Sequence, residues 1–342
     1  MILATDLRGF PAKRFPKLVL ALGVFDGVHL GHCAIFKKIR AEARKLRGKA
    51  VLLTFREHPQ NVLTPKSKTD LLTSFWHKLA LVEKEGIDLC IALHFSPAFS
   101  NLSPEEFVRR ILFEKLRVKG VILGHDSRFG HQREGDAALM AKLARKYGFK
   151  YAVVPPVRKA GGTVSSTRIR HLIAKGDLAL ASRLLGRNYS VSATVVRGSG
   201  RGHQLGFPTA NLDPHNEVLP PDGVYAARVR PVEFRTIALG RGLSRLVVMR
   251  HTKAWPAVLN LGIRPTFQQG AVFRVPEVHI LRFKGSLYGQ TVEVEFLKRL
   301  RDEKKFPTPA ALQKQILLDI QTAQRFFELY FREKVSYTRT LK

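Results

Sequence analysis

Two histidines that follow a short apolar run near the start of the chain restrict its fold more than any other feature. The run Leu18–Leu22 has the length and composition of a buried parallel strand. Residues 33–46 have a helical pattern, and Gly48 follows as the predicted C-cap. The turn between them reads Gly23-Val24-Phe25-Asp26-Gly27-Val28-His29-Leu30-Gly31-His32. A strand that leads through such a turn into a helix is typical of α/β domains that bind ligands at the strand's carboxyl end.

This turn has the physical properties of a phosphate site. Backbone amides and the helix dipole favour an anion at a helix N-terminus. Gly27 and Gly31 let a large ligand approach the backbone. The alternative, two ordinary turn glycines with surface histidines, explains the joint pattern less well. For Asp26 two roles stay open: a contact to magnesium or water, or a bond that holds the loop.

The same turn resembles the H-x-G-H signature of the nucleotidyltransferase superfamily. More narrowly, it resembles the family of bacterial bifunctional riboflavin kinases/FMN adenylyltransferases, also called FAD synthetases. Other segments resemble further motifs of that family in the family's order: residues 124–130, 164–170, 206–211, 260–267 and 277–279. The resemblance therefore covers nearly the whole chain.

Composition agrees with an intracellular enzyme of more than one domain. The 342 residues are enough for two separate cores. No apolar run approaches the length of a membrane span, and the first twenty residues lack the features of a secretory signal. The two cysteines, Cys33 and Cys90, provide neither a disulfide framework nor a cysteine zinc site. We therefore expect a cytoplasmic protein.

The formal net charge of +31 is unusual. It would attract anionic substrates such as ATP and flavin phosphates, and it permits binding to nucleic acid or an anionic membrane. The basic residues are spread along the chain, however, and those of the helix at 33–46 lie opposite its apolar positions. This distribution favours a solvated basic surface. We expect neither a dedicated nucleic-acid partner nor a membrane partner, and the sequence leaves the oligomeric state open.

The N-terminal half alternates strand and helix patterns. This alternation predicts a doubly wound parallel sheet, here of the nucleotidyltransferase type, over residues 1–186. In the predicted helix 104–116, Ser103 is the N-cap, Pro104 the first residue and Glu106 the partner in a capping box. The predicted strands are 18–22, 50–55, 89–95, 120–123 and 151–154, and the predicted helices include 33–46, 104–116 and 137–147.

The C-terminal half changes to a period of two. After two helices at 167–174 and 178–185, short strands separated by glycine and proline predict a small β-barrel over residues 187–342, with a terminal helix at 310–331. The stretch 231–253 is longer and more basic than the corresponding connection of the family, and no function follows for it. The predicted strands are 191–196, 224–229, 246–249, 257–261, 278–283 and 292–296.

In the N-terminal domain the resemblance implies transfer of an adenylyl group from ATP to FMN. The phosphate of FMN is already largely a dianion near neutral pH, so it needs no strong general base. Donors and cations that stabilise the developing charge carry such catalysis. By resemblance, His29, His32 and Arg168 are catalytic, and Arg168 can bind two phosphate oxygens at once. The implied ATP or phosphate ligands are Gly23, Phe25, Gly27, Gly31, Ser165, Ser166 and Thr167.

The resemblance further places Asp126 and Arg128 on the flavin or the nucleotide. A turn residue is the alternative for Asp126, because short polar side chains are common in turns. Two residues depart from the family's pattern: Ser127 replaces an aromatic residue, and Arg56 replaces an aspartate. Both changes leave the phosphate chemistry intact but put the flavin contacts in doubt.

In the C-terminal domain the resemblance implies an ATP-dependent riboflavin kinase without a P-loop. A glycine-rich loop can fold its amides onto phosphates, here through Gly198, Gly200 and Gly202. Thr209 and Asn211 are two residues apart, so both oxygens face one side of an extended strand. Few, hard oxygen ligands suit Mg²⁺ that already carries ATP phosphates. Without that context, the pair would read as polar residues on an exposed strand face.

Riboflavin's 5′-hydroxyl, unlike a phosphate, must lose a proton, so a carboxylate base is expected. The resemblance assigns this role to Glu277. Glu293 and Glu295 compete with it, although their alternation reads more simply as a solvent face. The main hypothesis is synthesis of FMN from riboflavin and then of FAD from FMN. The alternatives are a kinase with a weakened adenylyltransferase half, and a basic nucleic-acid-binding protein on a degenerate enzyme scaffold.

Overall fold

The computed structural model describes residues 1–339 except 65, 67, 199–205, 216 and 266–271. The chain forms two compact units that interleave in sequence. Unit 1 consists of Met1–Ile169, Leu184–Gly186 and Phe234–Val248, and unit 2 of Arg170–Arg183, Arg187–Glu233 and Met249–Lys342. The sequence predicted one boundary near residue 187.

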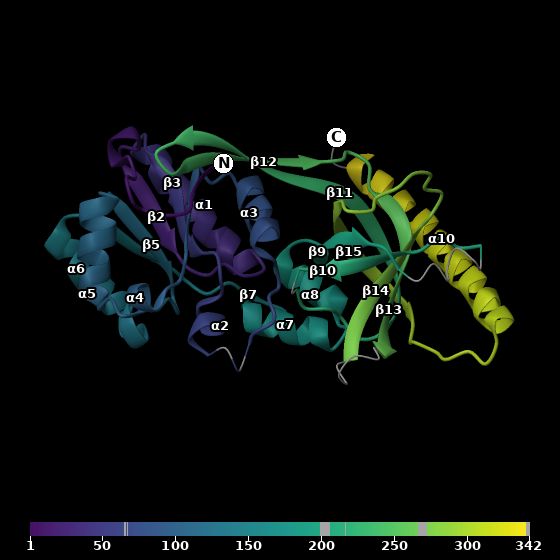
Figure 1. Cartoon of the computed structure of the whole chain (residues 1–342). Coiled ribbons are helices and arrows are strands. Elements are labelled where there is room, and N and C mark those ends of the chain that lie inside the picture. The colour runs from purple at the N-terminus through teal and green to yellow at the C-terminus, as the bar shows by residue number, and fades with distance from the viewer. Residues whose placement is uncertain (65, 67, 199–205, 216, 266–271, 340–342) are drawn as a thin grey trace. The chain divides into compact units, whose positions relative to one another are not determined.

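A largely parallel sheet forms the centre of unit 1 (Figure 1). Its described strands lie in the order β12-β1-β4-β3-β2-β5-β6, and only β12 is antiparallel to its neighbour. The expected doubly wound domain is confirmed. The strands are β1 (Ile2–Ala4), β2 (Leu18–Leu22), β3 (Lys49–Phe55), β4 (Leu89–Leu93), β5 (Gly120–Gly124), β6 (Lys150–Val154) and β12 (Leu243–Arg250).

Helices cover both faces of this sheet because its strands are apolar on both sides. Leu20 of β2 belongs to a core with residues of η2 (Phe107–Lys115) and α6 (Ala137–Tyr147). Its neighbour Val19 belongs to a second core with residues of α1 (Leu30–Lys45) and α3 (Phe75–Lys84). The shorter elements are η1 (Ala12–Arg14), α2 (Pro59–Leu63), α4 (Pro97–Ser100), α5 (Pro104–Glu106), η3 (His131–Arg133), β7 (Arg158–Lys159), β8 (Gly162–Thr163), α7 (Ser166–Ala174) and α8 (Leu178–Leu185).

Two helix ends illustrate what local sequence specifies. Ser103 and Glu106 form the predicted capping box, with reciprocal bonds of 3.2 Å. The predicted glycine C-cap of α1 is wrong: the left-handed residue is Arg47, with a φ of 51°. Gly48 is required for a different reason, since a Cβ there would lie 2.0 Å from the carbonyl oxygen of Lys17.

A closed barrel forms the centre of unit 2. Its described strands follow the order β13-β14-β10-β9-β15-β11, and β11 pairs with β13 to close the ring. The terminal helix α10 (Pro309–Arg339) packs Ala323 and Phe327 against Ala226 and Leu281, so the expected barrel with its helix is confirmed. The strands are β9 (Ser190–Val196), β10 (Ala210–Pro214), β11 (Gly223–Gly240), β13 (Trp255–Pro265), β14 (Val272–Ile280) and β15 (Thr291–Arg301).

The basic stretch 231–253 forms a long β-hairpin. Strands β11 and β12 extend well beyond the predicted 224–229 and 246–249. Residues 234–248 belong to unit 1, where β12 pairs with β1 through Leu243↔Ala4, Ser244↔Leu3 and Arg245↔Ile2. The hairpin thus supplies the strand that covers the outer edge of β1.

Candidate functional site

The two histidines of the first motif lie at the N-terminus of α1, as the sequence predicts. His29 is the N-cap, and the two residues form a reciprocal capping box. The backbone N–H of His32 donates to Nδ1 of His29 at 3.3 Å, and the backbone N–H of His29 donates to Nδ1 of His32 at 3.4 Å. Their rings stack with centroids 3.6 Å apart. Because each Nδ1 accepts a hydrogen bond, the proton of each neutral ring lies on Nε2.

The loop before these histidines has an unusual backbone. Phe25, Gly27 and Val28 all have positive φ angles, of 54°, 81° and 41°. Such angles are uncommon for side chains with a Cβ and strained for a β-branched one such as valine. Phe25 is buried and contacts the His32 ring edge-on, at 5.2 Å between centroids.

The glycines for which the sequence predicts phosphate contacts have no room for a side chain in this loop. A Cβ on Gly23 would lie 2.9 Å from the Phe25 ring, and one on Gly31 would lie 3.0 Å from the His29 ring. A Cβ on Gly27 would lie 2.7 Å from Leu72. The turn Gly23–His32 therefore packs against its own aromatic side chains and against Leu72, which lies in the segment before α3.

Asp26 holds this loop in place. Its carboxylate accepts hydrogen bonds from the backbone N–H of Leu72 and of Thr73, both at 3.0 Å, and from the Thr73 hydroxyl at 3.2 Å. The Thr73 hydroxyl oxygen also accepts from the backbone N–H of Gly27 at 3.1 Å. Asp26 is only 4% exposed. Of the two roles left open by the sequence, these contacts favour the loop-holding one.

The N-terminus of α7 adjoins the same loop. Ser165 accepts a hydrogen bond from the backbone N–H of Arg168 at 3.3 Å, which makes it the cap of this helix. The Ser166 hydroxyl donates to the carbonyl of Asp26 at 2.8 Å. Thr167 is exposed. Two helix N-termini thus converge beside the histidine pair, an arrangement that suits a ligand with several phosphates.

The guanidinium of Arg168 lies on the turn between β7 and β8. It donates to the carbonyls of Lys159 at 3.0 Å, Ala160 at 2.6 Å and Thr163 at 3.4 Å. These contacts order residues 159–163 beside the start of α7. Phosphate binding by Arg168 stays a prediction.

The loop after β5 carries the other predicted contacts of this site. The Asp126 side chain is 79% exposed, and its Oδ1 lies 3.8 Å from Nδ1 of His125. Arg128 is exposed and lies 3.6 Å from Asp136. Of the two residues that depart from the family's pattern, Ser127 closes a turn with Gly124, and Arg56 lies over the Phe75 ring at 5.6 Å. Flavin or nucleotide contacts by Asp126 and Arg128 stay predictions.

Sequence reasoning missed Lys78, a buried cation behind this loop. Its side chain is on α3, and its ammonium donates to the carbonyls of Val24 at 3.2 Å and Phe55 at 2.9 Å and to the Thr54 hydroxyl at 3.4 Å. One signal in the sequence could have found it, since Lys78 lies three residues after Phe75 and four before Val82, on the apolar face of its helix.

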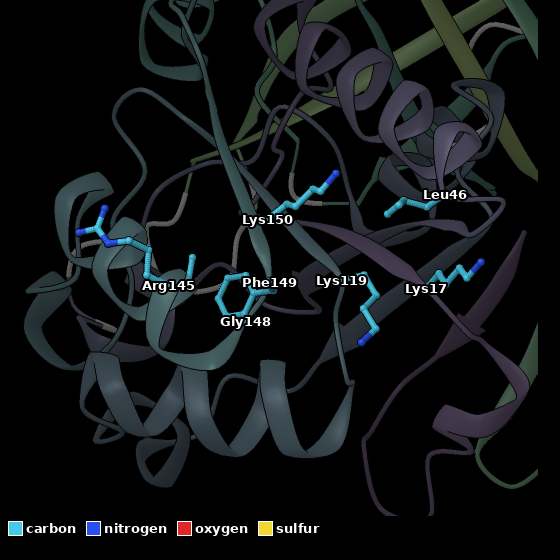
Figure 2. A pocket seen from close by; sticks show the side chains of 8 residues that line it. Lys17, Leu46, Lys119, Arg145, Gly148, Phe149 and Lys150 are labelled. Carbon is cyan, nitrogen blue, oxygen red and sulfur yellow. The ribbon is translucent and has the colours of Figure 1, made fainter.

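A hollow of about 490 Å³ lies at the opposite edge of the sheet. Lys17 and Lys119 directly precede β2 and β5, and Lys150 begins β6, so these are the amino ends of the strands. Figure 2 shows that the charged ends of these lysines point in different directions. The hollow is therefore separate from the histidine site, and its cations do not converge on one anion. Its lining is Lys17, Leu46, Lys119, Ala144, Arg145, Gly148, Phe149 and Lys150.

Unit 2 contains the second candidate site, on neighbouring strands of the barrel. Glu277 of β14 is directly opposite Asn211 of β10 and directly opposite Asn260 of β13. Directly opposite residues of antiparallel strands share a face, so the carboxylate lies between two amides. His279 donates from Nδ1 to the carbonyl of Pro208 at 2.9 Å, which ties β14 to the segment before β10.

The glycine-rich loop begins against this face. A Cβ on Gly198 would lie 2.6 Å from Nδ2 of Asn211, so only glycine leaves that amide in place. Asn211 is 8% exposed, and Thr209 directly precedes β10 and is half-buried. Gly200 and Gly202 lie outside the described residues. In the described part of the chain, no group of three or more His, Cys, Asp and Glu side chains could hold a metal. Oxygen ligands such as Thr209 and Asn211 still fit an ion that brings its other ligands.

The expectation that Glu293 and Glu295 face solvent is wrong. Glu295 accepts hydrogen bonds from the guanidinium of Arg228, at 2.7 Å from Nε, and from the amide of Asn188 at 2.8 Å. Glu293 lies 3.4 Å from Arg250, and both carboxylates are largely buried. Both carboxylates thus form ion pairs with arginines of the barrel wall.

Comparisons with known proteins match two successive segments of the chain to two families. A family model described as FAD synthetase matches residues 12–168, and one described as riboflavin kinase matches residues 185–327. The "Bifunctional riboflavin kinase/FMN adenylyltransferase" of Escherichia coli (strain K12) is 35% identical over 91% of this chain and 93% of its own length. The protein of the same name from Haemophilus influenzae is 33% identical over 90% of this chain and 94% of its own.

One solved structure has a similar fold over nearly the whole length. It is described as a macrolide-efflux protein from Streptococcus pneumoniae, with a TM-score of 0.78 and 29% identity, and the match covers 95% of this chain and 99% of that one. None of the helices in the described residues is long and apolar enough to cross a membrane.

Proposed function

Because the chain belongs to the family of bifunctional riboflavin kinases/FMN adenylyltransferases, we propose that its two activities reside in the two sites described above. The chain phosphorylates riboflavin to FMN and adenylylates FMN to FAD, with ATP as the second substrate of both reactions. The histidine pair of unit 1 serves the adenylyl transfer, and the Asn211–Glu277 face of unit 2 serves the phosphorylation.

In unit 1, an oxygen of the FMN phosphate attacks the α-phosphorus of ATP, and the bond from that phosphorus to the bridging oxygen breaks to release pyrophosphate. The Nε2–H groups of His29 and His32 donate to phosphate oxygens as charge moves onto the leaving group. Amides at the N-termini of α1 and α7 add fixed positive ends of two helix dipoles. The contacts with Gly23, Phe25, Gly27 and Gly31 come from the backbone of the loop.

The start of α7 holds the departing phosphates. Ser165, Ser166 and Thr167 supply amides and hydroxyls there, and Arg168 supplies a planar cation beside them. Asp126 and Arg128 contact the flavin or the nucleotide from the loop after β5. That loop is exposed, so these side chains can meet a ligand without rearrangement of the sheet.

In unit 2, Glu277 accepts the proton of the 5′-hydroxyl of riboflavin. The oxygen attacks the γ-phosphorus of ATP, and ADP leaves. Thr209 and Asn211 would hold Mg²⁺, which when bound neutralises charge on the ATP phosphates. The amides of Gly198, Gly200 and Gly202 bind those phosphates.

One observation carries the adenylyl site: the reciprocal capping box fixes both imidazole rings so that Nδ1 accepts and Nε2 carries the proton. Neutral imidazoles held in that form are donors, as phosphate oxygens require. The chain has two cysteines, and the fully buried Cys90 suits the reducing cytoplasm that the sequence predicts. We propose no nucleic-acid or membrane partner.

A crossed experiment tests the assignment. His29→Ala with His32→Ala should abolish FAD formation from FMN and leave FMN formation from riboflavin unchanged. Glu277→Gln should do the reverse and lower the turnover of riboflavin phosphorylation about 10²–10⁴-fold, the usual effect of losing a general base. Flavins are separated by chromatography after incubation with ATP and Mg²⁺. Equal loss of both activities in either folded variant would refute two independent sites, and FMN without FAD from the unmodified chain would select the kinase-only alternative.

A further inference from the structure

The strained loop Gly23–His29 requires support from its surroundings. Phe25 and Val28 hold positive φ angles without being glycine. A backbone in a sparsely populated region persists only where neighbouring groups over-determine it. Asp26 and Ser166 fix the loop at its middle. The start of the loop, at Val24, is fixed by a different side chain.

That side chain is Lys78, which is 5% exposed. An ammonium has three N–H donors, and Lys78 has three acceptors at the carbonyls of Val24 and Phe55 and the hydroxyl of Thr54. The Thr54 hydroxyl itself donates to the Val24 carbonyl at 3.1 Å. The cation therefore joins the loop after β2 to the carboxyl end of β3.

Burial and nearby acidic groups act in opposite directions on the charge of Lys78. Burial lowers the pKa of its ammonium, whereas Cys90, Asp26 and Glu57 oppose that shift. Asp26 and Glu57 are carboxylates, so they favour the ammonium by their negative charge. Burial raises the pKa of the Cys90 thiol to about 12, so that thiol is neutral where Lys78 titrates. Removal of the cation would take one hydrogen bond from each of the Val24 carbonyl, the Phe55 carbonyl and the Thr54 hydroxyl, and it would take away the attraction between Lys78 and Asp26.

We infer that Lys78 is a positioning residue for adenylyl transfer: its ammonium fixes the Val24 carbonyl and thereby the loop that presents His29 and His32 to ATP. This inference rests on the proposed function of the histidine pair. Lys78 touches no substrate in this role, and it acts through backbone geometry. A displacement of the reacting groups by about 1 Å can lower a rate about 10²-fold.

The test compares Lys78→Met with Lys84→Met in the full chain. Methionine keeps the apolar stem and removes the donors, and Lys84 is an exposed lysine on the same helix. For Lys78→Met we expect kcat of FAD formation from FMN to fall about 10²-fold with a much smaller change in KM, because placement rather than binding is impaired. Lys84→Met should match the unmodified chain. Riboflavin phosphorylation by the same preparations reports the amount of protein with a folded unit 2.

Two further measurements distinguish positioning from general destabilisation. Amide hydrogen exchange of Lys78→Met should increase at residues 23–29 and 72–73 and stay low in β2, β3 and β5; a general increase would overturn the inference. In the unmodified chain, kcat should fall as the pH rises through the lowered pKa of Lys78, below the value of an ordinary lysine, because a neutral amine has one donor fewer. The Cys90 thiol titrates only above that range.

The outcomes separate this inference from the function on which it rests. Normal kcat in Lys78→Met, together with an inactive His29→Ala/His32→Ala variant, would refute the role of Lys78 alone. Full FAD synthesis by the histidine variant would refute the site itself. If the fall of kcat at high pH persists unchanged in Lys78→Met, another group causes that fall, and the result counts against Lys78.

Discussion

Replacing Gly198 by alanine should disable riboflavin phosphorylation through a single steric contact. A Cβ at this position would lie 2.6 Å from Nδ2, 2.9 Å from Cγ and 3.0 Å from Oδ1 of Asn211, all closer than the 3.4 Å of ordinary contact. The amide must therefore move by about 1 Å, and Asn211 is too buried to move freely. A shift of this size in a proposed ligand of Mg²⁺ should lower kcat on the order of 10²-fold. Stability should change little, because only one side chain must yield.

The assay measures FMN formation from riboflavin at saturating ATP and Mg²⁺, with FAD formation from supplied FMN as the internal control. The double variant with Asn211→Ala is the decisive comparison. If Gly198→Ala acts through Asn211, its effect should largely disappear once that side chain is gone, so the two losses should not add. Additive losses, or a normal phosphorylation rate in Gly198→Ala, would refute the reasoning.

Two other predictions concern unit 1. Asp26→Asn removes the charge and turns one acceptor oxygen into a donor that faces a backbone N–H. It should therefore destabilise this unit by about 1.5–3 kcal/mol in urea unfolding, the range of a hydrogen bond to a charged group. The Mg²⁺ dependence of its residual FAD synthesis should be unchanged; a large shift would restore the metal-contact role. Arg168→Ala should impair FAD synthesis more than Arg168→Lys does. The activity of Arg168→Lys should still be well below that of the unmodified chain, because an ammonium cannot bind two phosphate oxygens in the plane of a guanidinium and cannot replace its three carbonyl contacts. Equal, full activity of both variants would make Arg168 a surface residue.

The spacing of apolar residues predicted most of the fold, because each long helix or strand buries residues at the period of that structure. The strand Leu18–Leu22 was predicted residue for residue, since both of its faces are buried and its composition shows it. The three-residue strand Ile2–Ala4 is too short to show any period. The long hairpin was underestimated because its exposed outer half carries polar and basic residues that resemble a loop.

Motifs pointed to His29, His32, Asn211 and Glu277, because each lies within a few residues of a recognisable strand or helix end. The supports of these groups come from distant segments. Thr73 and Lys78 are 46 to 54 residues from the loop they hold, and no sequence pattern near that loop indicates the contact. The ion pairs of Glu293 and Glu295 were missed for the same reason, since Arg228 and Arg250 approach them only when the barrel closes.

The pairing of β12 with β1 has a consequence for the making of this protein. Ile2 leaves the ribosome early, whereas its partner Arg245 follows more than two hundred residues later. At about 5–20 residues per second, the outer edge of β1 waits tens of seconds for its neighbour. During that time a row of unpaired backbone groups is open to other chains. The sheet of the adenylyltransferase half is therefore finished only after the first strands of the kinase barrel, β9 to β11, have been translated.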